Sequence, residues 1–131
     1  LPEDLMYHIG NRLNQLPVML EVKYKGKKFG FVHADLPVQD WELAKEMLIN
    51  NDSIDGRSFE DYLLWSRGII DDYRNTGKTV EIALVDNVFF GHTVLKEVTQ
   101  VGNCTFLDTG GVFKEKGLPY DLSIVKLSDY L

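Results

Sequence analysis

The alternation of apolar and polar residues divides the first third of the chain into a helix followed by a hairpin. Aliphatic residues recur at helical spacing over residues 3–16, which predicts an amphipathic helix that ends before Pro17. Residues 18–24 alternate as a half-buried strand does, and residues 28–33 are predicted to return as the partner strand. Gly30, inside that second strand, indicates close approach of another backbone or of a ligand.

The middle of the chain is predicted to be helical. Residues 39–50 have the spacing of a helix, and the polar stretch 50–58 is predicted to be a solvated loop. A second helix is predicted over residues 58–65, because Ser58 is a suitable N-cap residue and Asp61 follows three positions later.

The last third of the chain is predicted to be mainly strand. The pattern of residues 77–87 fits helix and strand equally well. Gly102 and Asn103 form a hairpin-turn signal between two short apolar runs. The predicted strands are 88–92, 97–101, 104–108 and 122–127. With no repeat or linker, the pattern predicts one α/β (α+β) domain over residues 1–131, with strand hairpins in a mixed sheet and flanking helices.

Composition and charge narrow the class of protein. The 131 residues are 44% hydrophobic, enough for a packed core, and the net charge of −6 disfavours nucleic acid as a partner. No apolar stretch approaches the about 20 residues that span a bilayer, and no signal-like N-terminus is visible, so we expect no membrane partner and a cytoplasmic location. The single cysteine, Cys104, fits a reducing compartment and is expected to be a buried, inert thiol.

Two histidines stand where an apolar strand ends and a loop begins. His33 closes "FGFVH" and His92 closes "VFFGH", the place where α/β proteins put their chemistry. A rigidly presented neutral imidazole suits a metal ion, although hydrogen-bonded histidines at a sheet edge explain the pair equally well. Gly91 would let a cofactor approach the backbone, and the Thr93 hydroxyl could hydrogen-bond a ligand group. His8 has no acidic or cysteine partner at ligand spacing and is assigned to packing or to the surface.

Four blocks of sequence resemble a known family of phosphatases. "LPVMLEVKYKGKKFGFVHADLP", "LLWSRG", "VFFGHTVLKEV" and "FLDTGGVF" occur in this order between Leu16 and Leu127. Together they resemble the C-terminal half of the small phage- and bacterial-type Ser/Thr protein phosphatases, in the calcineurin-like metallophosphoesterase superfamily. The resemblance implies one half of an α/β/β/α sandwich.

The resemblance also implies a dinuclear metal centre that activates a bridging water for in-line attack on phosphorus. Two divalent ions are expected in the complete enzyme, with manganese as the first choice and iron, zinc or nickel as alternatives. By the same resemblance, His33 and His92 ligate the second metal and Arg67 of "WSRG" contacts the substrate phosphate. A planar guanidinium can hold two phosphate oxygens. The alternative for Arg67 is a cation that favours the C-terminus of a helix.

Two carboxylates in the same blocks have more than one assignment. Near a metal-bound histidine, Asp35 or Asp108 could accept the second ring N–H and fix the tautomer. Asp35 could instead cap a turn before Pro37, and Asp108 could begin the "DTGG" loop. Trp41 and Trp65 are predicted to be packing anchors rather than platforms for a substrate.

The chain also departs from the family. Blocks of the type GDxHG, GDxxDRG and GNHE, which in the family supply the first-metal ligands, the bridging carboxylate and the general-acid histidine, do not occur in the sequence. We therefore expect the chain to be a piece of a longer phosphatase whose N-terminal half is missing. Alone it should be inactive, since each ion needs about three or four protein ligands. A bared sheet face would favour a homodimer or association with the missing half.

These expectations leave three functions open. The first is a metal-dependent phosphomonoesterase that acts on phosphoserine or phosphothreonine in proteins, or on small phosphate esters. The second stays in the superfamily but hydrolyses a dinucleotide polyphosphate or a cyclic phosphodiester, and "WSRG" favours the first over it. The third is a non-catalytic interaction domain derived from such an enzyme, which the missing ligands favour.

Overall fold

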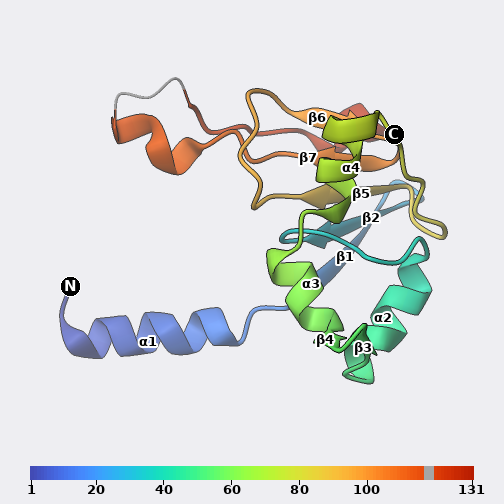
Figure 1. The fold of residues 1–131 in the computed structure, drawn as a ribbon. Coiled ribbons are helices and arrows are strands. Elements are labelled where there is room, and N and C mark those ends of the chain that lie inside the picture. Colours follow the sequence, from blue (N-terminus) through green and yellow to red (C-terminus); the bar gives the residue numbers. More distant parts are fainter. Residues whose placement is uncertain (117–119) are drawn as a thin grey trace.

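The computed structural model describes residues 1–116 and 120–131 (Figure 1). Its helices are α1 (Glu3–Asn14), α2 (Trp41–Ile49), α3 (Phe59–Trp65) and α4 (Gly68–Thr76), with 3₁₀ helices η1 (Gly111–Lys116) and η2 (Leu127–Tyr130). Its strands are β1 (Met19–Tyr24), β2 (Lys27–Val32), β3 (Ser53–Ile54), β4 (Arg57–Ser58), β5 (Asn87–Phe90), β6 (Thr99–Val101) and β7 (Cys104–Phe106). The predicted first three helices, the first hairpin and the hairpin around Gly102 are confirmed to within a few residues.

Five strands form one mixed sheet in the order β1-β2-β5-β7-β6. The inner pairs β2–β5 and β5–β7 are parallel, whereas the outer pairs β1–β2 and β6–β7 are antiparallel hairpins. Parallel neighbours need a long crossover connection, and the chain between β2 and β5 supplies it with α2, α3 and α4. The predicted fold class, a mixed sheet with hairpins and flanking helices, is therefore confirmed.

The core lies between one face of the sheet and these crossover helices (Figure 1). Trp41, at the start of α2, is fully buried there and donates a hydrogen bond from Nε1 to Glu21 in β1, at 2.8 Å. Its indole ring lies over Gly30 so closely that a Cβ on Gly30 would come within 2.5 Å of a ring carbon. Trp41 is thus a packing anchor as predicted, and the group that approaches Gly30 is this ring rather than a backbone or a ligand.

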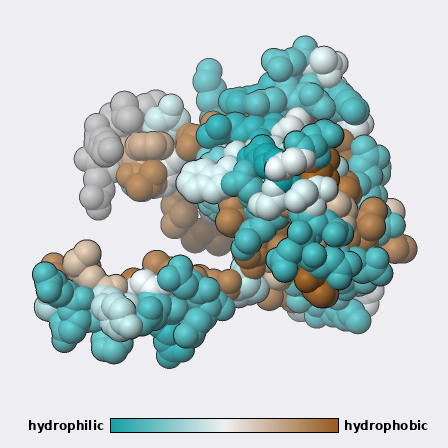
Figure 2. All heavy atoms as spheres, turned by 60° about the horizontal axis from the view of Figure 1, so that its bottom comes forward, coloured by the Kyte–Doolittle hydropathy of each residue, from teal (hydrophilic) through white to brown (hydrophobic). Residues whose placement is uncertain are grey.

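α1 stands away from the rest of the chain (Figure 1). Within the described residues none of its side chains is buried, although its apolar residues gather along one edge of the helix (Figure 2). Leu5, Ile9 and Leu13 remain 42%, 42% and 60% exposed. The predicted amphipathic helix is confirmed, but its apolar stripe has no partner in the described part of the chain.

One helix was not predicted from the sequence. α4 buries Ile69 and Ile70 against the core and ends at Gly77, which takes a left-handed conformation with φ of 73°. Glycine favours this helix-ending conformation because it has no Cβ. The loop predicted over residues 50–58 also contains a small hairpin, β3–β4, which turns at Asp55 and Gly56, both at positive φ.

Residues 77–87, whose pattern was ambiguous, and residues 122–127, predicted to be a strand, are mostly irregular in the structure. Of residues 77–87, only Asn87 belongs to a strand, β5. The rest are neither helix nor regular strand, and the Asn103 side chain bonds there to the backbone of Ile82 and Val85 in place of a strand partner. The strand predicted over 122–127 is wrong. In the described segment 120–131, a single bridge between Gly110 and Asp121 is followed by irregular backbone, so the apolar pattern had no strand edge to join.

Two smaller predictions concern the cysteine and the membrane. Cys104 is fully buried, and this burial raises the pKa of its thiol to about 12, so the expected inert thiol is confirmed. None of the helices in the described ranges is both long enough and apolar enough to cross a bilayer.

The contact between Gly30 and Trp41 gives a first prediction. Gly30→Ala should lower the free energy of unfolding by about 1–3 kcal/mol, because the new methyl group has to displace the buried indole ring. Urea denaturation followed by circular dichroism measures this. Gly10→Ala, in α1 where nothing lies within 4 Å of a new Cβ, is the control and should not lower stability. Equal stability of the Gly30→Ala variant would show that the indole is not held as described.

Candidate functional site

The site begins where two parallel strands end side by side. In the register of β2 and β5, Val32 is opposite Phe90, so the residues that follow leave the sheet at the same edge. The Gly91 backbone N–H donates to the His33 carbonyl at 2.8 Å. The His33 and His92 rings then meet edge to face, with centroids 5.0 Å apart. The structure therefore brings together the two histidines that the sequence singled out.

His92 is held in an unusual conformation. Its φ of 66° is in the left-handed region, which residues with a side chain seldom adopt and which often marks a functional position. Its Nε2 atom is buried and has no hydrogen-bond partner among the described residues. A buried polar nitrogen without a partner costs free energy, which makes His92 Nε2 a candidate contact for a bound group.

Trp65, the last residue of α3, forms one wall of this site. Its ring meets the His92 ring edge to face, with centroids 5.8 Å apart. The side chain is 63% exposed. The prediction that Trp65 is a packing anchor is therefore wrong, because α3 buries Phe59 and Leu63 on its core side and turns its last residue outward.

Asp108 and Thr93 lie close to the histidines. Asp108 and both histidines line one cavity of about 320 Å³, with Asp121 and Ser123 of the C-terminal segment on its other side. The Asp108 carboxylate accepts from the Gly110 N–H at 3.0 Å, so it begins the "DTGG" loop. The Thr93 hydroxyl is buried and, among the described residues, has no partner.

The surroundings of His33 favour its neutral imidazole. Partial removal from water lowers the pKa of His33, and the neighbouring His92 lowers it further, while the negative charge of Asp108 raises it. A lowered pKa keeps the ring unprotonated near neutral pH, as a metal ligand must be.

The Asp35 carboxylate faces the start of α4. The side chain is 3% exposed. One carboxylate oxygen accepts from the Gly68 N–H at 3.0 Å, and the other accepts from the Ile69 N–H at 3.2 Å. Both oxygens are thus engaged by a helix N-terminus, where a negative charge is stabilised. Support of a metal-bound histidine by Asp35 remains a prediction, as does the same role for Asp108.

Arg67 lies on the short connection between α3 and α4. It is exposed and directly precedes the first helical residue of α4. The N-terminus of a helix is its electropositive end, so a cation there gains nothing from α4. Arg67 also follows the end of α3, two residues after Trp65, which touches His92. The backbone thus places Arg67 next to the wall of the site, and its contact with phosphate remains a prediction.

The residues present fit part of a metal site. Two imidazoles meet, and one carries a buried nitrogen without a described partner. Within residues 1–116 and 120–131, however, no group of three or more His, Cys, Asp or Glu side chains is arranged to hold an ion. Because an ion needs about three or four protein ligands, these residues can supply two ligands but not a complete site.

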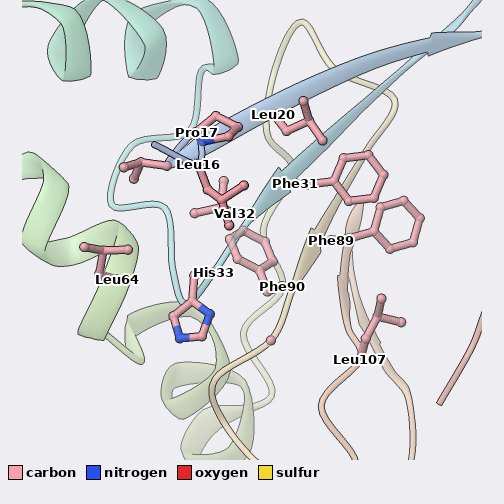
Figure 3. A pocket seen from close by; sticks show the side chains of 12 residues that line it. Leu16, Pro17, Leu20, Phe31, Val32, His33, Leu64, Phe89, Phe90 and Leu107 are labelled. Atoms are coloured by element: carbon pink, nitrogen blue, oxygen red, sulfur yellow. The ribbon is translucent and has the colours of Figure 1, made fainter. Parts of the chain in front are cut away.

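An apolar hollow of about 470 Å³ adjoins the site and is lined by the sheet face that carries Leu20, Phe31 and Phe89 and by Leu64 of α3. Figure 3 shows the stacked rings of Phe31 and Phe89 in it, with Leu20 from β1 and with His33 at its edge. Leu20 is 48% exposed. Tyr130 of η2 covers a part of this face, with its ring 5.0 Å from that of Phe89. This face is therefore apolar and only partly covered by the described chain.

Comparison with known proteins supports a relationship to phosphatases. The chain is similar to serine/threonine-protein phosphatase 1 of Salmonella typhimurium, with 29% identity over 99 residues, which are 76% of this chain and 38% of that protein. It is also similar to serine/threonine-protein phosphatase 2 of the same organism, with 29% identity over 96 residues, 73% of this chain and 38% of that protein. No family model matches the chain. The matches cover well under half the length of these curated relatives.

Several residues of the site had no recognisable signal in the sequence. Asp121 and Ser123 reach the cavity only because the C-terminal segment folds back beside Thr109, whose hydroxyl contacts Ser123 Oγ at 2.6 Å. Trp65 could have been placed at the site from its position at the end of a predicted helix, three residues before a glycine. Its exposure, by contrast, depends on which side of α3 meets the core.

The pKa of His33 gives a second prediction, to be measured by NMR titration of the ring C–H in metal-free buffer. His92→Ala should raise the pKa of His33, because it removes the neighbouring imidazole that disfavours a proton on His33 and it uncovers the ring. Asp108→Asn should lower it further, because it removes a negative charge. Asp4→Asn, in α1, is the control and should leave the titration of His33 unchanged.

The sign of the stability effect follows from the same shift. The unfolded chain takes up the His33 proton near its ordinary pKa of about 6.5, whereas the folded chain takes it up only at lower pH. His33 should therefore contribute to a loss of stability as pH falls below that value. If His92→Ala and Asp108→Asn moved the pKa of His33 in the same direction, the described surroundings of His33 would be contradicted.

Proposed function

We propose that this chain contributes part of the active site of a metal-dependent phosphomonoesterase, of the Ser/Thr protein phosphatase type. The observation that carries the proposal is the meeting of His33 and His92 at one sheet edge, with the buried Nε2 of His92 lacking a described partner. The similarity to two bacterial Ser/Thr protein phosphatases supports the reaction class. The substrate would be a phosphoprotein or a small phosphate ester.

The residues of this chain would then have distinct tasks. His33 and His92 would hold one of two divalent ions, manganese being the first choice and iron, zinc or nickel alternatives. When bound, such ions supply an activated water for attack on phosphorus. Arg67 would bind two phosphate oxygens and stabilise the charge that grows on them. Thr93 would hydrogen-bond within the site, and Asp108 would keep the His33 ring oriented.

We further propose that the remaining ligands come from outside the described residues. The described chain provides two imidazoles, and the matched relatives are much longer than the matched segment. A longer gene product would supply carboxylates, a general acid and the cover for the apolar sheet face. The chain alone should then have negligible phosphatase activity.

A second candidate function follows from the same incompleteness. A chain that holds two ligands of one ion could be a non-catalytic interaction domain derived from a phosphatase. Hydrolysis of a dinucleotide polyphosphate or a cyclic phosphodiester is the other enzymatic alternative. Assays of the full-length gene product with each substrate class separate the three.

The decisive experiment measures manganese-dependent turnover of p-nitrophenyl phosphate by the full-length gene product. His92→Ala should lower kcat/KM by roughly 100-fold or more, since loss of a ligand should exceed the roughly 10- to 100-fold cost of losing a ligand's supporting partner. Arg67→Ala should lower it by roughly 100- to 1,000-fold, as loss of a transition-state donor does.

His8→Ala is the matched control, because His8 lies in α1 with its ring against Tyr7 and is exposed. Its kcat/KM should equal that of the unchanged protein. Metal-dependent turnover that survives His92→Ala would falsify the assignment, and absence of turnover from the full-length product would leave the interaction domain as the better reading.

The apolar sheet face gives a separate prediction. The isolated chain should self-associate through it, and Leu20→Lys should shift the chain toward monomer in size-exclusion chromatography with light scattering, because a charge would enter the interface. Ile49→Lys, on α2 and 78% exposed, is the matched control and should not change the mass. A clean monomer of the unchanged chain at high concentration would count against this face as an interface.

A further inference from the structure

The three residues that follow β2 hydrogen-bond to three different segments around the candidate site. The His33 carbonyl accepts from the Gly91 N–H at 2.8 Å, which fixes it to the segment that carries His92. The next residue, Ala34, donates its N–H to the Leu63 carbonyl in α3 at 2.8 Å. The third, Asp35, accepts from the first two backbone N–H groups of α4. Each successive residue therefore bonds to a different element of the site.

The third connection is the one made by a side chain. Asp35 is 3% exposed, and its carboxylate contacts the N-terminus of α4, the end of a helix that favours negative charge. The two N–H groups belong to Gly68 and Ile69, the residues directly after Arg67. Gly68 also fits closely, because a Cβ there would lie 2.9 Å from the Asp35 carboxylate oxygen. The contact is thus two-pronged and closely fitted, and the carboxylate that makes it is buried.

The Arg67 backbone lies between the end of α3, where the Ser66 N–H donates to the Tyr62 carbonyl at 3.1 Å, and the start of α4. Its φ of −132° and ψ of 23° are outside the helical region, and Ser66 before it is extended. Its carbonyl accepts from the Asp71 N–H at 2.9 Å, which ties it to α4. The position of Arg67 therefore depends on where α4 begins, and the Asp35 carboxylate holds that beginning.

From these contacts we propose that Asp35 is a positioning residue for Arg67. The effect of Asp35 on catalysis rests on the proposed phosphatase function, whereas its effect on the position of Arg67 does not. Its carboxylate ties the start of α4 to the backbone two residues beyond His33. It thereby sets the distance between the α3–α4 connection, which carries Arg67, and the histidines. This task differs from orienting a metal-bound histidine, because both oxygens are committed to α4. Misplacing a phosphate-binding group by about 1 Å can cost 100-fold in rate.

The first test needs no catalysis and uses the chain itself. Asp35→Asn keeps the side-chain shape but replaces one acceptor oxygen by an NH₂ donor that faces a backbone N–H. Amide exchange at Gly68 and Ile69 should speed up by roughly 10-fold or more, and the Arg67 backbone and Nε–H resonances should shift. Gly68→Ala places a methyl group against the same carboxylate from α4 and should shift the same resonances. If one of the two variants fails to fold, the other still tests the proposal.

Asp40→Asn is the matched control. Asp40 caps α2 through one oxygen only, which accepts from the Leu43 N–H at 2.9 Å, and asparagine can keep that bond. It should leave the exchange of α4 and the Arg67 resonances unchanged. Unaltered Arg67 resonances in both Asp35→Asn and Gly68→Ala would overturn the proposal.

The second test measures kcat/KM of the full-length gene product on a phosphate monoester. Asp35→Asn should lower it roughly 10- to 100-fold, but by less than about 3-fold when Arg67 is already alanine, because the positioned group is then absent. Equal losses in the two backgrounds would overturn the positioning role, since a structural defect acts regardless of Arg67. If the unchanged protein has no activity, the proposed function fails, and the Arg67 resonances alone decide the tie to Asp35.

Discussion

The parallel pairing of β2 with β5 is the constraint on which the rest of the structure depends. Parallel strands end at the same edge, so the residues that follow them must lie side by side. The same pairing demands a long crossover, which places α2, α3 and α4 on one face and closes the core there. One hydrogen-bond pattern thus creates both the core and the place where His33 and His92 meet.

At that edge, polar groups that no longer have a partner in the sheet hydrogen-bond to neighbouring elements instead. The carbonyl of His33, the N–H of Ala34 and the carboxylate of Asp35 bond to three different segments. Buried polar groups need such partners, so their loss would cost stability as well as geometry. The hydrogen bonds that give these polar groups partners at the end of β2 therefore also hold the segments of the candidate site together.

The site and the sheet face share one kind of incompleteness. The histidines offer two ligands and a buried nitrogen without a described partner, and the face beside them offers aromatic side chains with partial cover. A metal ion with several further ligands would satisfy the first, and a second layer of protein would satisfy the second. Both requirements point to the same side of the molecule, where His33 borders the apolar hollow (Figure 3).

The sequence by itself determined the elements whose signals are local. Helical spacing marked α1 and α2, the Ser58 cap marked α3, and alternation with Gly102 and Asn103 marked the hairpins, because these features act through neighbouring residues. It also singled out His33 and His92 at strand ends. Tertiary structure alone decided that residues 122–127 form no strand, that Trp65 faces outward, and that Asp35 bonds to α4. Those outcomes depend on which surface lies opposite each segment, and that is fixed only when the sheet and its crossover helices have come together.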